Sequence, residues 1–167
     1  ITSSGASSYG IHSESNSGTE TISNTSNDTI STSGSSAHGI FVSSNTGTST
    51  ITNSGTIQVT GSDAVGIKMD GGVTFTNSGT ISATGSATKA IESTGSNNDT
   101  LNLSSGSNIT GSIDLGAGTD TVNISGRGIS QSLTFANTEN INLNGVAGTV
   151  NSSVANTVDP TGSSVLG

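Results

Sequence analysis

Cysteine is absent from the 167-residue chain, and aromatic residues make up only 2 % of it. The absence of cysteine excludes a disulfide framework and thiolate metal sites, and it fits bacterial surface proteins that cross an oxidising periplasm. Hydrophobic residues reach 28 %, well below the roughly 45–50 % of an ordinary globular domain. The chain must therefore be disordered, or adopt a fold that needs few apolar groups per residue.

Proline occurs once, at Pro160, and β-branched residues are plentiful, which favours strands over disorder. Eleven carboxylates stand against Lys68, Lys89 and Arg127, so the net charge is −8. Phosphate binding needs clustered Lys and Arg, and nucleic acid is therefore not an expected partner. No apolar run approaches the ~20 residues of a membrane helix, and no signal peptide is recognisable. We expect no membrane insertion by this segment, which is either a mature product or part of a longer protein.

An internal repeat determines the expected fold class. The segment ITSSGASSYGI, from Ile1, recurs as ISTSGSSAHGI from Ile30, IQVTGSDAVGI from Ile57 and ISATGSATKAI from Ile81. The copies start 29, 27 and 24 residues apart, and each has Gly four places after the first Ile and another Ile ten places after it. Only Ala90 departs from glycine at the place before the second Ile.

Each period contains three apolar anchor points, such as Ile30, Ile40 and Ile51, with apolar and polar residues alternating around them. Alternation is typical of half-buried strands, and Gly, Asn and Ser between them supply tight turns. Three short strands and three corners per period predict an all-β fold, a parallel β-helix (solenoid) whose stacked coils complete one another's backbone hydrogen bonds. We predict β-helix over residues 1–145, with coils starting near 1, 30, 57 and 81, and a weakly patterned end or linker over 146–167.

The second half of the chain has a shorter period of 19 to 21 residues. The matching apolar pairs are Leu101 and Leu103 with Val122 and Ile124, then with Ile141 and Leu143, and Ile113 and Leu115 with Leu133 and Phe135. The later coils should therefore be smaller. We expect about seven coils in all, with three strands per coil in the N-terminal half.

Asn24, Asn53 and Asn77 fall at one equivalent corner of successive coils. Stacked asparagines can form a hydrogen-bonded ladder, and we assign these three a structural role rather than a binding role.

The segments TITNSGTIQVTGSDAVGI and DTLNLSSGSNITGSIDLGAGTDTVNISG closely resemble the passenger domains of bacterial autotransporters. The resemblance covers about residues 1–145. It implies a right-handed β-helix displayed on, or secreted from, a Gram-negative cell after export through an outer-membrane translocator. The repeat is shared by adhesins, toxins and protease carriers, so the resemblance is informative for architecture more than for activity.

Catalytic groups are sparse. A serine protease needs a histidine base, but His12 and His38 fall at different places in the repeat and are expected to face solvent. A polysaccharide-active enzyme needs carboxylates with a base; Arg127 is near Asp114 and Asp120 in sequence, but a surface ion pair is the simpler interpretation.

Calcium is the one cofactor that the sequence suggests. The segment GAGTDTV, residues 116–122, matches the core of a glycine-rich calcium-binding nonapeptide, and residues 95–101 are a degraded copy. These place Asp99 and Asp120 at one corner, 21 residues apart rather than nine, so turn-capping carboxylates are the alternative.

We therefore expect a non-catalytic, extracellular structural or adhesive module whose partner is a host or neighbouring-cell surface. The alternative is a filament subunit that stacks on itself end to end, because no polar capping helix is evident at either end and open solenoid ends expose unpaired strand edges. An enzyme built on a β-helix is the third and least favoured hypothesis.

Overall fold

The computed structural model of the chain describes residues 1–126, 133–144, 150–152 and 157–160. These residues form strands and turns and contain no helix, hence none long and apolar enough to cross a membrane. The strands are β1 (Thr2–Ser3), β2 (Ile11–Ser15), β3 (Thr21–Asn24), β4 (Thr29–Thr32), β5 (Ile40–Asn53), β6 (Thr56–Val59), β7 (Val65–Asn77), β8 (Thr80–Ala83), β9 (Lys89–Ser93), β10 (Thr100–Leu103), β11 (Asn108–Thr110), β12 (Ser112–Asp114), β13 (Thr121–Ser125), β14 (Leu133–Ala136), β15 (Asn140–Asn144), β16 (Val150–Ser152) and β17 (Thr157–Pro160).

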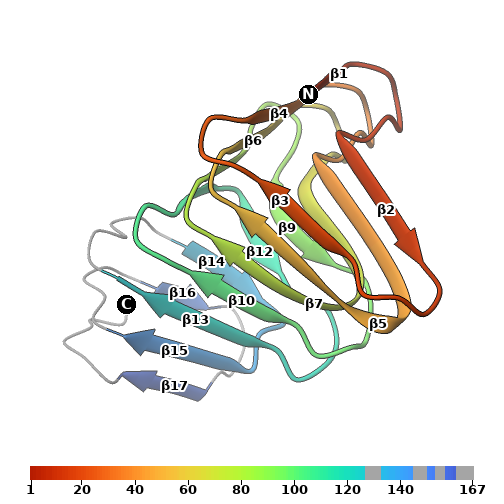
Figure 1. Ribbon diagram of the computed structural model, residues 1–167. Helices are drawn as coiled ribbons and strands as arrows, with labels where there is room; N and C mark the ends of the chain where they lie inside the picture. The colour runs from red at the N-terminus through yellow and green to blue at the C-terminus, as the bar shows by residue number, and fades with distance from the viewer. Residues whose placement is uncertain (127–132, 145–149, 153–156, 161–167) are drawn as a thin grey trace.

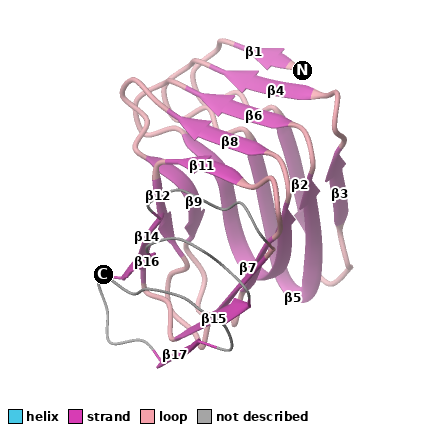
Figure 2. Cartoon of the chain, turned by 90° about the vertical axis from the view of Figure 1, so that its left-hand side faces the viewer, coloured by secondary structure: helices cyan, strands magenta, loops and turns pink. Residues whose placement is uncertain are grey.

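The strands stack in parallel as a β-solenoid, which confirms the predicted fold class (Figure 1). One face is a five-stranded sheet in the order β1-β4-β6-β8-β11. Figure 2 shows these strands one below the other, from β1 at the top. The other two faces belong to one twelve-stranded sheet, because β5 and β7 each run through the corner between them. The coils wind in a right-handed sense from the N-terminal end (Figures 1 and 2).

Three columns of apolar side chains fill the solenoid, as the three anchor points per period predicted. The column under the five-stranded face contains Ile30, Ile57, Ile81 and Ile109. The column under the second face contains Ile11, Ile40, Ile67, Ile91, Ile113 and Phe135. The third contains Ile22, Ile51, Phe75, Leu101, Val122 and Ile141. Because each coil contributes only about four or five large side chains to this core, a chain of low hydrophobicity can still exclude water from it.

The predicted number of coils needs correction. Among the described residues the five-stranded face ends at β11, so its five strands span four complete three-sided turns. The other two faces continue through β14 and β15 to β16 and β17, beyond residue 145. The described residues therefore form about four full turns, followed by stacked strands on two faces.

The shorter period of the second half is present, with one error of register. Leu101 pairs with Val122, and Val122 pairs with Ile141, at the predicted spacings. Ile113, however, pairs with Phe135 rather than with Leu133. Leu133 and Phe135 are both buried core residues two positions apart on β14, so periodicity alone does not decide which of them pairs with Ile113. On the opposite side of β12, the pairing with β9 is irregular between Ser112 and Ile113.

Close stacking at one corner explains the glycine that precedes the second Ile of each repeat. A Cβ on Gly39 would lie 2.5 Å from the carbonyl oxygen of Gly66 in the next coil and 2.6 Å from Cγ2 of Ile57. Ala90 is tolerated at the equivalent position because the irregularity in β12 leaves it without a paired residue, as Ser112 pairs with Lys89 and Ile113 with Ile91.

We predict that Gly39→Ala destabilises the protein by at least about 2 kcal/mol, because the backbone of Gly66 cannot move without breaking the ladder. Denaturant unfolding followed by circular dichroism measures this effect. Gly72→Ala is the matched control, since a Cβ there would have its nearest contact at an ordinary 3.7 Å. Equal stability of the two variants would contradict the close stacking described at this corner.

Candidate functional site

The asparagines Asn24, Asn53 and Asn77 form the ladder that the sequence predicted. Asn24 Nδ2 donates to Asn53 Oδ1 at 2.7 Å, and Asn53 Nδ2 donates to Asn77 Oδ1 at 2.8 Å. All three side chains are buried. Asn77 Nδ2 donates to the carbonyl of Gly79, and the ladder ends there because Leu103 occupies the next position in register. The amides therefore hold three coils in register from inside the solenoid.

A second asparagine ladder runs along the outer surface of the later coils, and the sequence analysis missed it. Asn123 Nδ2 donates to Asn102 Oδ1 at 2.9 Å, and Asn142 Nδ2 donates to Asn123 Oδ1 at 2.7 Å. The three residues are direct register partners on β10, β13 and β15. Their spacings of 21 and 19 residues equal those of the apolar pairs beside them, so the same periodicity could have identified this ladder.

The acidic residues Asp99, Asp120 and Glu139 form a third ladder, at the corner before β10, β13 and β15. Asp99 Oδ1 accepts from the backbone N–H of Val73 at 2.8 Å. Asp120 Oδ1 accepts from the N–H of Asp99, and Glu139 Oε2 from the N–H of Asp120, both at 2.7 Å. Each carboxylate thus caps the backbone of the preceding coil, which is the structural alternative considered for this corner.

The second oxygen of each aspartate carboxylate makes the ionised form of this ladder unfavourable. Oδ2 of Asp99 and of Asp120 is buried without a hydrogen-bond partner, and so is the hydroxyl of Ser93. Burial raises the pKa of Asp99 to about 6; the nearby Ser93 hydroxyl and the Val73 N–H oppose the rise, and Asp120 adds to it. Burial, assisted by Glu139, also raises the pKa of Asp120.

No cluster of three or more His, Cys, Asp or Glu side chains able to hold a metal ion occurs in the part of the chain that the structure describes. A calcium ion at Asp99 and Asp120 therefore remains a prediction, and it would have to use their second oxygens together with backbone or hydroxyl oxygens.

Several aromatic and charged side chains lie on one face, along β2, β5, β7, β9 and β12. The register brings His12, Phe41, Lys68, Glu92 and Asp114 into one column that crosses five strands. We call this surface, with the neighbouring residues Tyr9, His38 and Lys89, the mixed face. The sequence analysis did not predict it, because the repeat assigned these residues to variable outward positions.

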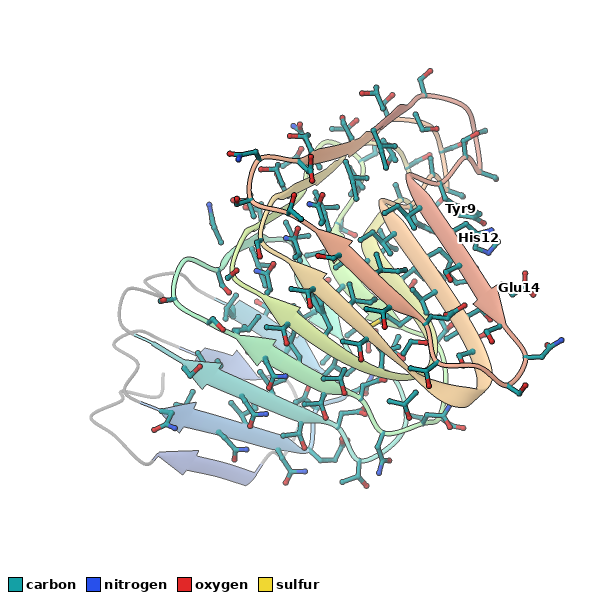
Figure 3. The ribbon with its side chains drawn as sticks, in the orientation of Figure 1. Tyr9, His12 and Glu14 are labelled. Carbon is teal, nitrogen blue, oxygen red and sulfur yellow. The ribbon has the colours of Figure 1, made fainter. Side chains whose placement is uncertain are left out.

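Four rings gather at the N-terminal end of the mixed face. Tyr9 stacks on His38 with ring centroids 5.5 Å apart, and His12 stacks on Phe41 at 5.0 Å. Figure 3 shows Tyr9 and His12 projecting outward beside Glu14. The two stacks touch each other, since the rings of Tyr9 and His12 are 4.9 Å apart.

The two histidines differ, which corrects the expectation that both face solvent. His12 is exposed, whereas His38 is only 6 % exposed. His38 Nδ1 accepts a hydrogen bond of 3.0 Å from the backbone N–H of Val65 in the next coil. Burial, and then the charge of Lys68, lower the pKa of His38 to about 4, while Glu92 opposes this shift. His38 is therefore a neutral structural acceptor near pH 7.

Below the rings, Glu92 connects both described lysines. It pairs with Lys68 at 3.5 Å and with Lys89, which also lies 3.9 Å from Asp114. The hydrogen bond to Glu92 is the main reason why the pKa of Lys89 is raised. A pocket of about 220 Å³ opens here, lined by Asp63, Ala64, Val65, Lys68, Ser86, Thr88, Lys89 and Glu92. Arg127, considered above as a partner of Asp114 and Asp120, lies outside the described residues.

Comparison with known proteins gives no relative: no family model, no curated protein and no solved structure matches the chain.

We predict that Asn53→Ala destabilises the protein by about 3 kcal/mol, because it leaves polar groups of both Asn24 and Asn77 buried without their partner. Asn123→Ala, in the outer ladder, should cost less than about 1 kcal/mol, since water can replace the lost hydrogen bonds there. Guanidinium unfolding of the two variants measures the difference. If both variants lost the same stability, the inner ladder would not hold the coils together as described.

We predict that the protein loses stability as the pH rises from about 4 through 6. The unfolded chain has an ordinary Asp pKa near ~4, so the folded state, with Asp99 at about 6, binds more protons in this window. Asp99→Asn keeps an oxygen acceptor for the Val73 N–H without the charge, and it should flatten this dependence by roughly 1–2 kcal/mol.

Thermal unfolding of the wild type and Asp99→Asn between pH 4 and 7 tests this prediction. Asp70→Asn, an exposed residue, is the charge-matched control. The same slope in wild type and Asp99→Asn would show that the buried carboxylate does not titrate as described. Stabilisation by calcium at pH 7 that disappears in Asp120→Asn would instead identify these carboxylates as metal ligands.

Proposed function

We propose that this chain is a non-catalytic structural and adhesive segment of an extracellular β-helix, displayed on or secreted from a Gram-negative bacterium. The observation that carries the proposal is that the side chains that hold the coils together and the side chains of the mixed face occupy separate columns of the solenoid. Side-chain ladders hold successive coils together along its axis, and a row of aromatic and charged side chains lies on the mixed face. A rigid support of this kind is better suited to presenting a binding surface than to catalysing a reaction.

The bonding of the ionisable groups supports a non-catalytic role. The imidazole of His38 accepts from a backbone N–H, and the carboxylates of Asp99 and Asp120 do the same. The lysines of the mixed face are paired with Glu92. Groups engaged in this way stabilise coil stacking, whereas a catalytic acid or base has to reach a substrate proton.

The resemblance of the repeats to autotransporter passenger domains supports the extracellular location. The absence of cysteine and the scarcity of basic residues agree with it, because such segments cross an oxidising periplasm and have no need to bind nucleic acid.

End-to-end assembly into a filament is the alternative, and it would use the edge of the first coil. Within the described residues, β1, β2 and β3 have strand partners on one side only. Ile1 is 63 % exposed there and lines an open pocket of about 260 Å³ together with Ile11 and Ile30. A second copy stacked on this edge would pair its backbone and cover its apolar groups.

We predict that beads carrying the chain, attached through one added terminal cysteine, adhere to cultured epithelial cells or to Gram-negative bacteria under flow. Retention should exceed that of uncoated beads several-fold, and it should disappear after irreversible heat denaturation of the coat. Electron microscopy of the same protein over a range of concentrations should show short, separate rods.

Retention equal to that of uncoated beads on every surface would contradict adhesion. Long filaments that appear as the concentration rises would favour the assembly alternative instead. A variant with Ile1→Asp at the exposed edge distinguishes these outcomes, because it should prevent stacking and leave bead retention unchanged.

A further inference from the structure

Four rings of the chain form one platform at its surface. Phe75 and Phe135 are buried in the core. The other rings with a described environment, Tyr9, Phe41 and the two histidines, lie together at the top of the mixed face, with neighbouring centroids 4.9 to 6.2 Å apart. In a surface composed mainly of Ser, Thr, Asn and Gly, this platform offers aromatic surface that is partly accessible. Tyr9 and Phe41 are half-buried and His12 is exposed.

The platform is held in position before any ligand arrives. The rings are stacked in pairs across adjacent coils, and His38 is fixed from below by the Val65 N–H. Ordering aromatic side chains in advance lowers the entropic cost of binding. A ligand with a flat C–H face could therefore pack on these rings at little cost.

Hydrogen-bonding groups begin one coil further along the same column. Phe41 is the register partner of Lys68, and Lys68 is the partner of Glu92. The pocket beside them adds the exposed carboxylate of Asp63 and the hydroxyls of Ser86 and Thr88. The column from His12 to Asp114 crosses four strand spacings, roughly 19 Å at ~4.8 Å each.

A ligand that matches this strip needs apolar faces at one end and several hydroxyl groups at the other. A saccharide chain has both, because each ring carries a C–H face and a rim of hydroxyls. The charges of this surface indicate whether the saccharide is neutral or acidic. The lysines are already paired with Glu92, carboxylates adjoin them, and the whole chain has a net charge of −8, so an acidic polymer would be repelled.

We propose that the mixed face binds a neutral oligosaccharide, with sugar rings packed on Tyr9 and Phe41 and sugar hydroxyls hydrogen bonded to Glu92, Lys68 and Asp63. This inference rests on the proposed adhesive function and identifies the surface and the class of ligand that would serve it. The bound chain lies along the solenoid axis, across successive coils.

Isothermal titration calorimetry with four neutral hexasaccharides, of glucose, galactose, mannose and N-acetylglucosamine, tests the proposal, with hexagalacturonate as the acidic probe. We expect at least one neutral probe to bind, with an affinity that does not change with salt concentration. Phe41→Ser should weaken it about tenfold or more, a change of about 1.4 kcal/mol. Gln58→Ala, an exposed residue on the five-stranded face, is the control and should bind like the wild type.

Asp63→Asn provides a second variant in case Phe41→Ser perturbs folding. Asp63 is exposed in a left-handed conformation that Asn readily adopts, so this variant should fold normally and bind several-fold more weakly. Binding to no neutral probe, binding only to hexagalacturonate, or equal binding by wild type and both variants would overturn the proposal.

The bead assay separates this inference from the function on which it rests. Wild-type beads that adhere while no neutral hexasaccharide binds would leave adhesion standing and point to a protein receptor, which overturns the saccharide. Saccharide binding without bead adhesion would overturn the adhesive function and leave the ligand class in place.

Discussion

The spacing between stacked strands, about 4.8 Å, is the constraint on which the other features of this protein depend. Parallel stacking in register places each residue directly above its counterpart, so every position becomes a column. In a column of asparagines, each side-chain amide hydrogen bonds to the next, as in Asn24, Asn53 and Asn77. A column of aliphatic side chains forms a continuous core, and a corner with no room for a Cβ must be glycine, as at Gly39.

A column of like charges is unfavourable because stacked neighbours repel one another. Two arrangements reduce this repulsion in the chain. On the mixed face, Glu92 pairs with Lys68 in the preceding coil, and Lys89 lies between the like charges of Glu92 and Asp114. At the buried corner, three acids follow one another, and a backbone N–H of the preceding coil stabilises one oxygen of each. The unpartnered second oxygens of Asp99 and Asp120 remain, and the raised pKa values of both residues report that cost.

Periodicity in the sequence predicts well which residues of the same type stack in one column. It predicts poorly the places where the register shifts or where unlike residues stack. The apolar anchors and the inner asparagines could be predicted because the same residue type recurs at the coil spacing. The register of Ile113 could not, since Leu133 and Phe135 are both buried core residues two positions apart and either fits the repeating pattern. The burial of His38 depends on the Val65 N–H of the next coil, and the mixed face combines unlike residues, so neither leaves a repeating signal.

The stacking register itself can be measured directly because the chain has no cysteine of its own. Ser31 and Gln58 are register partners on adjacent coils, whereas Ser31 and Ser82 lie two coils apart. Oxidation of a Ser31→Cys/Gln58→Cys variant should form an intramolecular disulfide, since paired Cα atoms lie within the range of about 4.4–6.8 Å that a disulfide spans. Ser31→Cys/Ser82→Cys should stay reduced under the same conditions. Equal crosslinking of both pairs, or of neither, would contradict the stacked solenoid.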